Sequence, residues 1–169
     1  MPASKISLDK AKSDKLFYVV ANVVVYRPSD GRCLLLKRSE QETAHPGKYG
    51  VIGGKLEWAD LDITKPTRLN GDVLDYEGAI EKLLEREVME EAGVTISAGL
   101  TYLNSVAYIR PDGIPSILIK FAATYAGGEV SLEEGAFTDF AWANAEEAKG
   151  LPCIAGIADE VATAIAHFQ

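Results

Sequence analysis

The stretch from Ala79 to Ala92 constrains the fold of this chain more than any other part of the sequence. Its apolar residues recur at helical spacing: Ile80, Leu83, Leu84 and Val88. This spacing predicts an amphipathic helix whose apolar side is buried, and Gly93 is placed to end it as a C-cap. Burial of one side anchors the helix and leaves the other side free to face a cleft.

The other side of this helix carries three glutamates. Glu87, Glu90 and Glu91 lie at spacings of three and four residues, so they share one helix face. Carboxylates this close repel one another, and a hard divalent cation such as Mg²⁺ relieves the repulsion because it prefers oxygen ligands shared with substrate phosphates. The plain alternative is a solvated acidic face on which Arg86 and Glu90 form an ordinary ion pair.

Strands and helices alternate along the rest of the chain. Strands are predicted at residues 16–26, 33–37, 49–52, 101–110, 116–125 and 138–142, and helices after Asn144 and from residue 154. Turn signals at residues 28–31 and 111–113 join strands, and Gly53-Gly54 is expected to break the strand before it. The order of these elements predicts an α/β sandwich with a mixed sheet.

Composition narrows the class of protein. Hydrophobic residues make up 47% of the 169 residues, which predicts a globular chain with a single domain over residues 1–169, of which 1–15 are a polar lead-in. The net charge is −8 and the 17 lysines and arginines are scattered, so we expect no nucleic-acid partner. Since no apolar stretch reaches bilayer length, we expect a cytoplasmic protein without a membrane partner.

One string of residues is highly specific. Residues 86–94, R-E-V-M-E-E-A-G-V, match the second half of the Nudix box, whose pattern is G-x5-E-x7-R-E-U-x-E-E-x-G-U with U an apolar residue. Upstream, residues 46–57 resemble the family's approach to the box, usually of the form PGxWxxPGGxxE. The chain is therefore similar to Nudix hydrolases over residues 16–150. The resemblance implies an α/β/α sandwich that hydrolyses a phosphoanhydride bond in a nucleoside diphosphate linked to another moiety.

The resemblance also implies roles for individual residues. Glu87 and Glu91 are the main metal ligands, Glu90 is a further ligand or helps to activate water, and the cofactor is Mg²⁺ or Mn²⁺. Arg86 holds the carboxylates in place by charge-assisted hydrogen bonds. The backbone carbonyl of Gly54 completes the metal shell, since a glycine lets the main chain approach a cation closely.

The match breaks between the two halves of the box. Gly54 and Arg86 are 32 positions apart where the family pattern has 14, so 18 additional residues lie between them, and we expect an insertion loop at residues 58–76. Gly78 stands where the pattern has a glutamate, and Glu57 or Glu77 can substitute for it. The insertion is either a tolerated surface loop or a substrate-facing lid.

Further residues are candidates for the chemistry. Many Nudix enzymes carry an acidic residue on a loop after the box helix, and the candidates here are Glu133, Glu134 and Asp139, with Glu134 as the first choice for general base. The alternative is an ordinary acidic loop. Three residues near the box are assigned to substrate binding: Arg38, Lys55 and Glu57. For Arg38 and Lys55 the alternative is a surface ion pair.

Two rival functions follow from the same residues. A nucleotide- or sugar-nucleotide-sensing domain would keep the fold without the chemistry, and the displaced box glutamate motivates it. A diphosphate isomerase resembles the chain in fold but needs a cysteine in the cleft, and neither Cys33 nor Cys153 is placed for that role. We expect a small-molecule nucleotide partner, and the apolar C-terminal helix fits a homodimer. The sequence leaves the substrate and the oligomeric state open.

Overall fold

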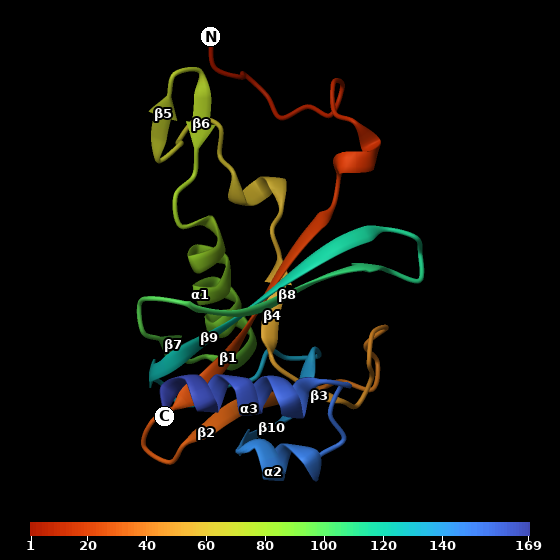
Figure 1. Ribbon diagram of the computed structural model, residues 1–169, viewed down its shortest axis with the longest axis vertical. Coiled ribbons are helices and arrows are strands. Elements are labelled where there is room, and N and C mark those ends of the chain that lie inside the picture. Colours follow the sequence, from red (N-terminus) through yellow and green to blue (C-terminus); the bar gives the residue numbers. More distant parts are fainter.

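The centre of the molecule is a twisted β-sheet, shown in Figure 1. The computed structural model describes residues 1–169. Its strands are β1 Tyr18–Arg27, β2 Arg32–Arg38, β3 Tyr49–Gly50, β4 Ile52–Lys55, β5 Arg68–Asn70, β6 Val73–Asp75, β7 Thr95–Ile96, β8 Thr101–Ile109, β9 Pro115–Gly127 and β10 Phe137–Ala143. Its helices are α1 Ala79–Ala92, α2 Ala145–Lys149 and α3 Ile157–Phe168, with 3-10 turns η1 Ser13–Lys15 and η2 Trp58–Asp60. No helix combines the length and the apolar character that crossing a membrane requires.

The main sheet is mixed. Its strands follow the order β10-β2-β1-β9-β7, while β3 pairs with β2, β4 with β1 and β8 with β9. β1 and β9 run parallel over a long register, from Tyr18 opposite Ser116 to Tyr26 opposite Thr124, and the other strand pairs are antiparallel. The expected α/β fold with a mixed sheet is therefore confirmed.

Apolar residues of β1 alternate between two cores, one on each face of the sheet. Val23 and Val25 join a cluster that includes the buried side of α1, whereas Val24 joins a cluster with Val161 of α3. Figure 1 shows α1 and α3 on opposite faces of the sheet. The expected apolar stripe of α1 is buried as predicted, with Leu84 and Val88 fully inaccessible to solvent, so α1 is fixed against the sheet.

The expectation of a strand break at Gly53-Gly54 was wrong. Both glycines lie within β4, where Gly53 pairs with Asn22 and Gly54 with Ala21 of β1. A Cβ atom on Gly53 would lie 2.5 Å from the carbonyl oxygen of Ala21 and 2.9 Å from the Cα of Asn22. Gly53 thus permits a close approach of β4 to β1, and the pair does not form a turn.

The segment between β4 and α1 has structure of its own. It holds the turn η2 and a separate two-stranded hairpin, β5–β6, which stands apart from the main sheet beyond the N-terminal end of α1 (Figure 1). Arg68 of β5 pairs with Asp75 of β6 at 2.8 Å and with Glu77 at 3.2 Å. The sequence predicted only a loop over residues 58–76, because these short exposed strands carry no apolar alternation.

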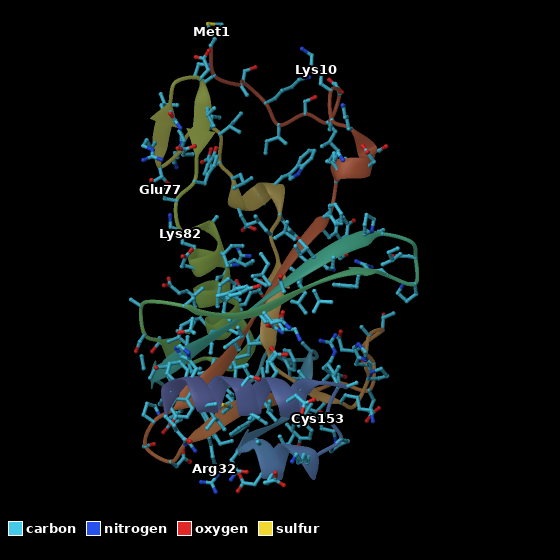
Figure 2. The ribbon with its side chains drawn as sticks, viewed as in Figure 1. Met1, Lys10, Arg32, Glu77, Lys82 and Cys153 are labelled. Atoms are coloured by element: carbon cyan, nitrogen blue, oxygen red, sulfur yellow. The ribbon has the colours of Figure 1, made fainter.

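The short helix α2, which follows β10, is linked to β2 by an ion pair between Arg32 and Glu147. Nε and Nη2 of Arg32 donate to the two carboxylate oxygens of Glu147 at 2.9 and 2.8 Å, and Glu147 also forms the capping box that Asn144 begins. Arg32 lies at the lower end of the molecule in Figure 2. The hydrogen bonds from Arg32, then that from the backbone N–H of Asn144, lower the pKa of Glu147 to about 2.

We expect Glu147→Gln to lower the melting temperature at pH 7 and to have no effect near pH 2. A carboxyl whose folded pKa of about 2 lies below its ordinary 4.5 contributes stability that is complete above pH 4.5 and is lost as the pH falls towards 2. Thermal unfolding of wild type and variant across this range measures the difference. Glu146→Gln, which breaks an exposed pair with Lys149, is the control with a small effect at every pH.

Candidate active site

The acidic side of α1 contains two glutamates that turn inwards and one that does not. The Glu87 side chain is 17% exposed, Glu91 is half-buried, and the Glu90 side chain is 58% exposed. Burial, then the charges of Glu87 and Glu133, raises the pKa of Glu91 to about 8. Burial also raises the pKa of Glu87, although Arg86 opposes the shift. Glu87 and Glu91 thus form a pair with unbalanced negative charge in a poorly solvated position.

The strand β4 closes directly against this pair. A Cβ atom on Gly54 would lie 2.5 Å from the carboxyl carbon of Glu87, so only glycine leaves room for the carboxylate there. The backbone N–H of Gly53 interacts with Glu91 and, together with the charge of Arg38, lowers its pKa against the larger effect of burial. Main-chain groups of β4 and carboxylates of α1 therefore line one narrow space.

Arg86 connects the pair to the segment after β4. Its guanidinium donates to Oδ1 of Asp60 and, at 3.4 Å, to Oε1 of Glu87, while Nε lies 4.0 Å from Glu90. The role expected for Arg86, to hold a carboxylate by charge-assisted hydrogen bonds, thus has a geometric basis. Asp60 as its main partner was not expected, because the two residues are 26 positions apart in the sequence.

Asp60 is positioned by the turn η2. Its Oδ2 accepts a hydrogen bond of 2.8 Å from the N–H of Glu57, and the Glu57 side chain caps the same turn by accepting from the Asp60 N–H. Burial of Asp60 acts to raise its pKa, but the hydrogen bonds from Arg86 and Glu57 outweigh it, and the pKa is lowered. Glu57, expected at the substrate, therefore serves here as a cap for η2.

Two cationic residues were assigned to substrate binding. Arg38 donates to the carbonyl of Ala44 and to Glu42, both at 2.7 Å, and is close enough to Glu91 to influence its pKa. Lys55 ends β4 with an exposed side chain and forms no ion pair. Arg38 thus borders the pair from β2, and Lys55 is a free cation on the strand that carries Gly54.

Among the acidic residues after the helix, the structure brings Glu133 to the pair. The N–H of Glu133 donates to the carbonyl of Glu91 at 3.1 Å, and its charge raises the pKa of both Glu87 and Glu91. Glu134, the first choice from the sequence, is exposed and takes part in neither effect. Asp139 lies elsewhere on β10 and accepts a hydrogen bond of 2.6 Å from the hydroxyl of Tyr49.

Neither cysteine offers a reactive thiolate. Cys33 is fully buried in the core on the α3 side, and burial raises its pKa to about 12. Cys153, labelled in Figure 2, is partly buried, and its Sγ donates to the carbonyl of Ala148. Burial raises its pKa as well. A reaction that needs a thiolate at the acidic pair therefore finds no candidate in this chain.

The acidic side chains of α1 do not converge on a common metal position in this structure. No three aspartate, glutamate, histidine or cysteine side chains converge tightly enough to hold a metal ion. The expected set of Glu87, Glu90 and Glu91 is thus not assembled, because Glu90 points towards solvent and Glu87 is turned onto Arg86. The close approach of the β4 main chain to Glu87 and the raised pKa of Glu91 both fit a divalent cation, which would offset the charge of the pair.

Comparison with known proteins gives a consistent result. A family model described as the NUDIX domain matches residues 17–163. NAD-capped RNA hydrolase NudC of Chromobacterium violaceum is 30% identical over 128 residues, which cover 76% of this chain and 39% of that protein. This chain therefore spans about two fifths of the length of that curated relative.

Solved structures agree in fold. The MutT NUDIX hydrolase from Burkholderia pseudomallei has a TM-score of 0.63 at 22% identity, covering 87% of this chain and 97% of that one. The NUDIX domain of Shewanella oneidensis NrtR, in a cocrystal structure with ADP ribose, has a TM-score of 0.66 at 16% identity, covering 96% of each chain. Together with the family model, these likenesses show that the chain belongs to the Nudix hydrolase family.

Proposed function

We propose that this chain hydrolyses a phosphoanhydride bond in a nucleoside diphosphate linked to another moiety, with Mg²⁺ or Mn²⁺ as cofactor. The observation that carries the proposal is the inward pair Glu87 and Glu91, packed closely against the glycine main chain of β4. A pair of partly buried carboxylates without a cation lowers the stability of a fold, so its presence indicates a use.

Four groups would hold the cation. They are the carboxylates of Glu87 and Glu91, the carbonyl oxygen of Gly54 and, after a change of side-chain conformation, Glu90. A divalent cation bound there would lower the pKa of a bound water and neutralise charge on the phosphate oxygens of the substrate. Arg86, itself held by Asp60, orients Glu87 by a charge-assisted hydrogen bond.

Other groups of the chain would act on substrate and water. Arg38 borders the acidic pair and Lys55 is a free cation, so both are suited to phosphate oxygens of the substrate. Glu133 is the acidic residue best placed to accept a proton from the attacking water, since its charge already acts on Glu87 and Glu91. Glu133 therefore replaces Glu134 as the proposed general base.

We expect Glu133→Gln to lower kcat about a hundredfold with little change in KM, because it removes the group that accepts the proton of the attacking water. Glu134→Gln is the matched control one residue further along the same exposed loop, and we expect it to retain wild-type kcat. Steady-state kinetics of both variants give the answer. A larger loss in Glu134→Gln than in Glu133→Gln would restore Glu134 as the base.

The names of two relatives support the substrate class. NudC is named for hydrolysis of NAD-capped RNA, and the NrtR domain was solved with ADP ribose. Both names describe a nucleoside diphosphate joined to a further group, the same class that we propose for this chain. A single domain, a cytoplasmic location and a homodimer stay predictions.

A sensing domain without catalysis is the second candidate. The observation in its favour is that the acidic side chains are not gathered as a metal site in this conformation, while the fold resembles an NrtR domain solved with ADP ribose. Such a domain would bind the same ligands and release no product. The acidic pair favours the enzyme. Two partly buried carboxylates repel the phosphates of a ligand, so a domain that only binds nucleotides has no use for them.

A hydrolysis screen distinguishes the two candidates. Purified protein is incubated with Mg²⁺ and then Mn²⁺ and a panel of nucleoside triphosphates, sugar nucleotides, NADH and dinucleoside polyphosphates, and products are separated by chromatography. Release of a nucleoside monophosphate from one group of substrates is the expected result. Folded protein that binds a panel member and releases nothing would favour the sensing domain.

A further inference from the structure

The strand β8 forms an open edge of the main sheet. It pairs with β9 on one side, and no other strand pairs with it. The end of the hairpin that β8 and β9 form reaches away from α1 and α3 in Figure 1. All residues from Asn104 to Ile109 are exposed. Because consecutive residues of a strand point to opposite faces of the sheet, neither face of this part of β8 is covered.

The side chains of β8 do not protect this edge. Edge strands of monomeric proteins commonly carry charged residues, proline or a bulge, which prevent pairing with another chain. β8 has no charged residue, and its bulge, between Tyr102 and Asn104, leaves the strand from Asn104 onwards regular. Four large apolar side chains are exposed along it: Tyr102 (59%), Val106 (40%), Tyr108 (38%) and Ile109 (78%). The edge is therefore open to pairing with a further strand.

The main chain of β8 has free hydrogen-bonding groups along the same edge. In an antiparallel pair, residues whose main chain bonds to the neighbouring strand alternate with residues whose main chain points away from it. The N–H of Arg110 donates across the hairpin to the carbonyl of Ile114 at 3.1 Å. Counting back from Arg110, the N–H and C=O groups of Ile109 and Ala107 point away from β9. Pro115, which is opposite Ile109 and has no N–H, agrees with this alternation.

The other edge of the sheet differs from β8. It is formed by β10, which carries the charged residue Asp139 and a register shift between Phe137 and Asp139. Both features discourage pairing with a further strand. Pairing of β8 with β10 of another copy would also repeat without closure and give a filament, whereas pairing of β8 with β8 about a two-fold axis closes at two chains. The sheet edges therefore favour a symmetric pair.

Charge favours a second copy of this chain as the partner. Two copies repel each other because each has a net charge of −8, so they approach closely only through an uncharged surface. The longest stretch without Asp, Glu, Lys or Arg is residues 92–109, which contains the whole of β8. A charged partner strand would find no opposite charge on β8. An identical antiparallel strand matches it in length, in apolar side chains and in free main-chain groups.

The exposed area of β8 is on the scale of a dimer interface. At about 200 Å² for a fully exposed side chain of this size, the four apolar side chains expose roughly 400 Å² together. This is about half of the roughly 800 Å² that each partner contributes to a standard interface. The exposed residues Asn104, Ser105 and Ala107 and the free main-chain groups add to it.

We propose that this chain forms a homodimer in which β8 of one copy pairs antiparallel with β8 of the other, so that one sheet continues across both copies. The C-terminal helix is less suited to the contact, because Ile157 and Val161 of α3 are buried in the core of their own chain. The proposal concerns assembly alone and does not rest on the proposed hydrolysis.

Sedimentation velocity of the full chain, from low to high micromolar concentration, tests the proposal. The wild type is compared with Val106→Lys and Ile109→Lys, which place like charges close to each other across the two-fold axis. Val73→Lys, on the exposed strand β6, is the matched control. Each substitution lowers the net negative charge equally, so general repulsion between copies cannot explain a difference among them.

We expect the wild type at twice the monomer mass of 18.2 kDa. Val106→Lys and Ile109→Lys should weaken association at least about a hundredfold, because like charges at an interface are strongly unfavourable. Val73→Lys should keep the wild-type association constant within about twofold. The substituted side chains are exposed in the single chain, so circular dichroism should show an unchanged fold for all three variants.

Hydrogen exchange of the wild type, followed by NMR, locates the contact without any variant. In the single chain the N–H of Ala107 points away from β9 and exchanges rapidly, whereas in the dimer it is bonded to the second copy. Its protection should therefore rise with protein concentration. The N–H of Tyr108 is the internal control, because the same alternation directs it to β9 in both states.

Four results would overturn the proposal. They are a wild type that stays monomeric at high micromolar concentration, a dimer that both β8 lysine variants retain, a dimer in which Ala107 stays unprotected, and a continuing series of larger oligomers in place of a closed pair. Absence of hydrolysis by a protein that dimerises through β8 would contradict the proposed function alone, so the two failures are separable.

Discussion

Glu91→Gln is expected to lower kcat about a thousandfold, the scale seen when a preorganised charge is removed from an active site. Glutamine keeps the shape of the side chain and loses the negative charge that the cation requires. Glu91 is half-buried between α1 and β4, so no water can easily take its place. Initial rates in Mg²⁺, with circular dichroism to verify the fold, are the measurement.

Glu91→Gln should lower activity and yet make the fold more stable at high pH. This combination distinguishes loss of a metal ligand from damage to the fold. A carboxyl whose folded pKa of about 8 lies above its ordinary 4.5 favours the folded state less as the pH rises from 4.5 through 8. In EDTA, the wild type should therefore lose melting temperature over this range, and Glu91→Gln should not. Added Mg²⁺ should stabilise the wild type alone. Near-wild-type turnover by the folded variant would remove Glu91 from the metal site.

Gly54→Ala is expected to lower kcat at least about a hundredfold, because displacement of a catalytic group by about 1 Å has an effect of this size. The added Cβ would lie 2.5 Å from the carboxyl carbon of Glu87, so either the carboxylate or β4 must move. Four β4 residues pair with β1, which holds the strand in place, and the displacement therefore falls on Glu87.

Gly150→Ala is the control for an added methyl group. Gly150 ends α2 in a right-handed helical conformation that any residue adopts, and its Cβ would meet only the carbonyl of Glu147 at 3.3 Å. We expect wild-type kinetics from it. Kinetics and Mg²⁺-dependent melting of both variants are compared, and unchanged turnover in Gly54→Ala would contradict the close contact between β4 and Glu87.

The elements whose signals are local were predicted from the sequence. The bounds of α1 follow from its apolar stripe and from Gly93, whose left-handed conformation ends the helix. The helix α2 follows from Asn144, whose side chain accepts from the N–H of Glu147. The α3 helix begins at Ile157 rather than at residue 154, because Gly156 in a left-handed conformation immediately precedes it.

Features that depend on distant partners were not predicted. A Gly-Gly pair favours a turn when only its neighbours in sequence are considered, and the approach of Asn22 decides that it is a strand. Asp60 becomes the partner of Arg86 only through the turn η2. Glu133 replaces Glu134 as the proposed general base because its N–H donates a hydrogen bond to the carbonyl of Glu91, in the last turn of α1. Residue spacing in the sequence does not predict this contact.

Hydrolysis in ¹⁸O-labelled water tests the central claim most directly. The best substrate of the panel is cleaved with Mg²⁺ in labelled water, and both products are analysed by mass spectrometry. Attack of water on phosphorus at the Glu87–Glu91 pair predicts one ¹⁸O atom in a phosphate group of one product, with no label gained in EDTA or with Glu91→Gln. Label in neither phosphate, or equal cleavage by Glu91→Gln, would contradict the account.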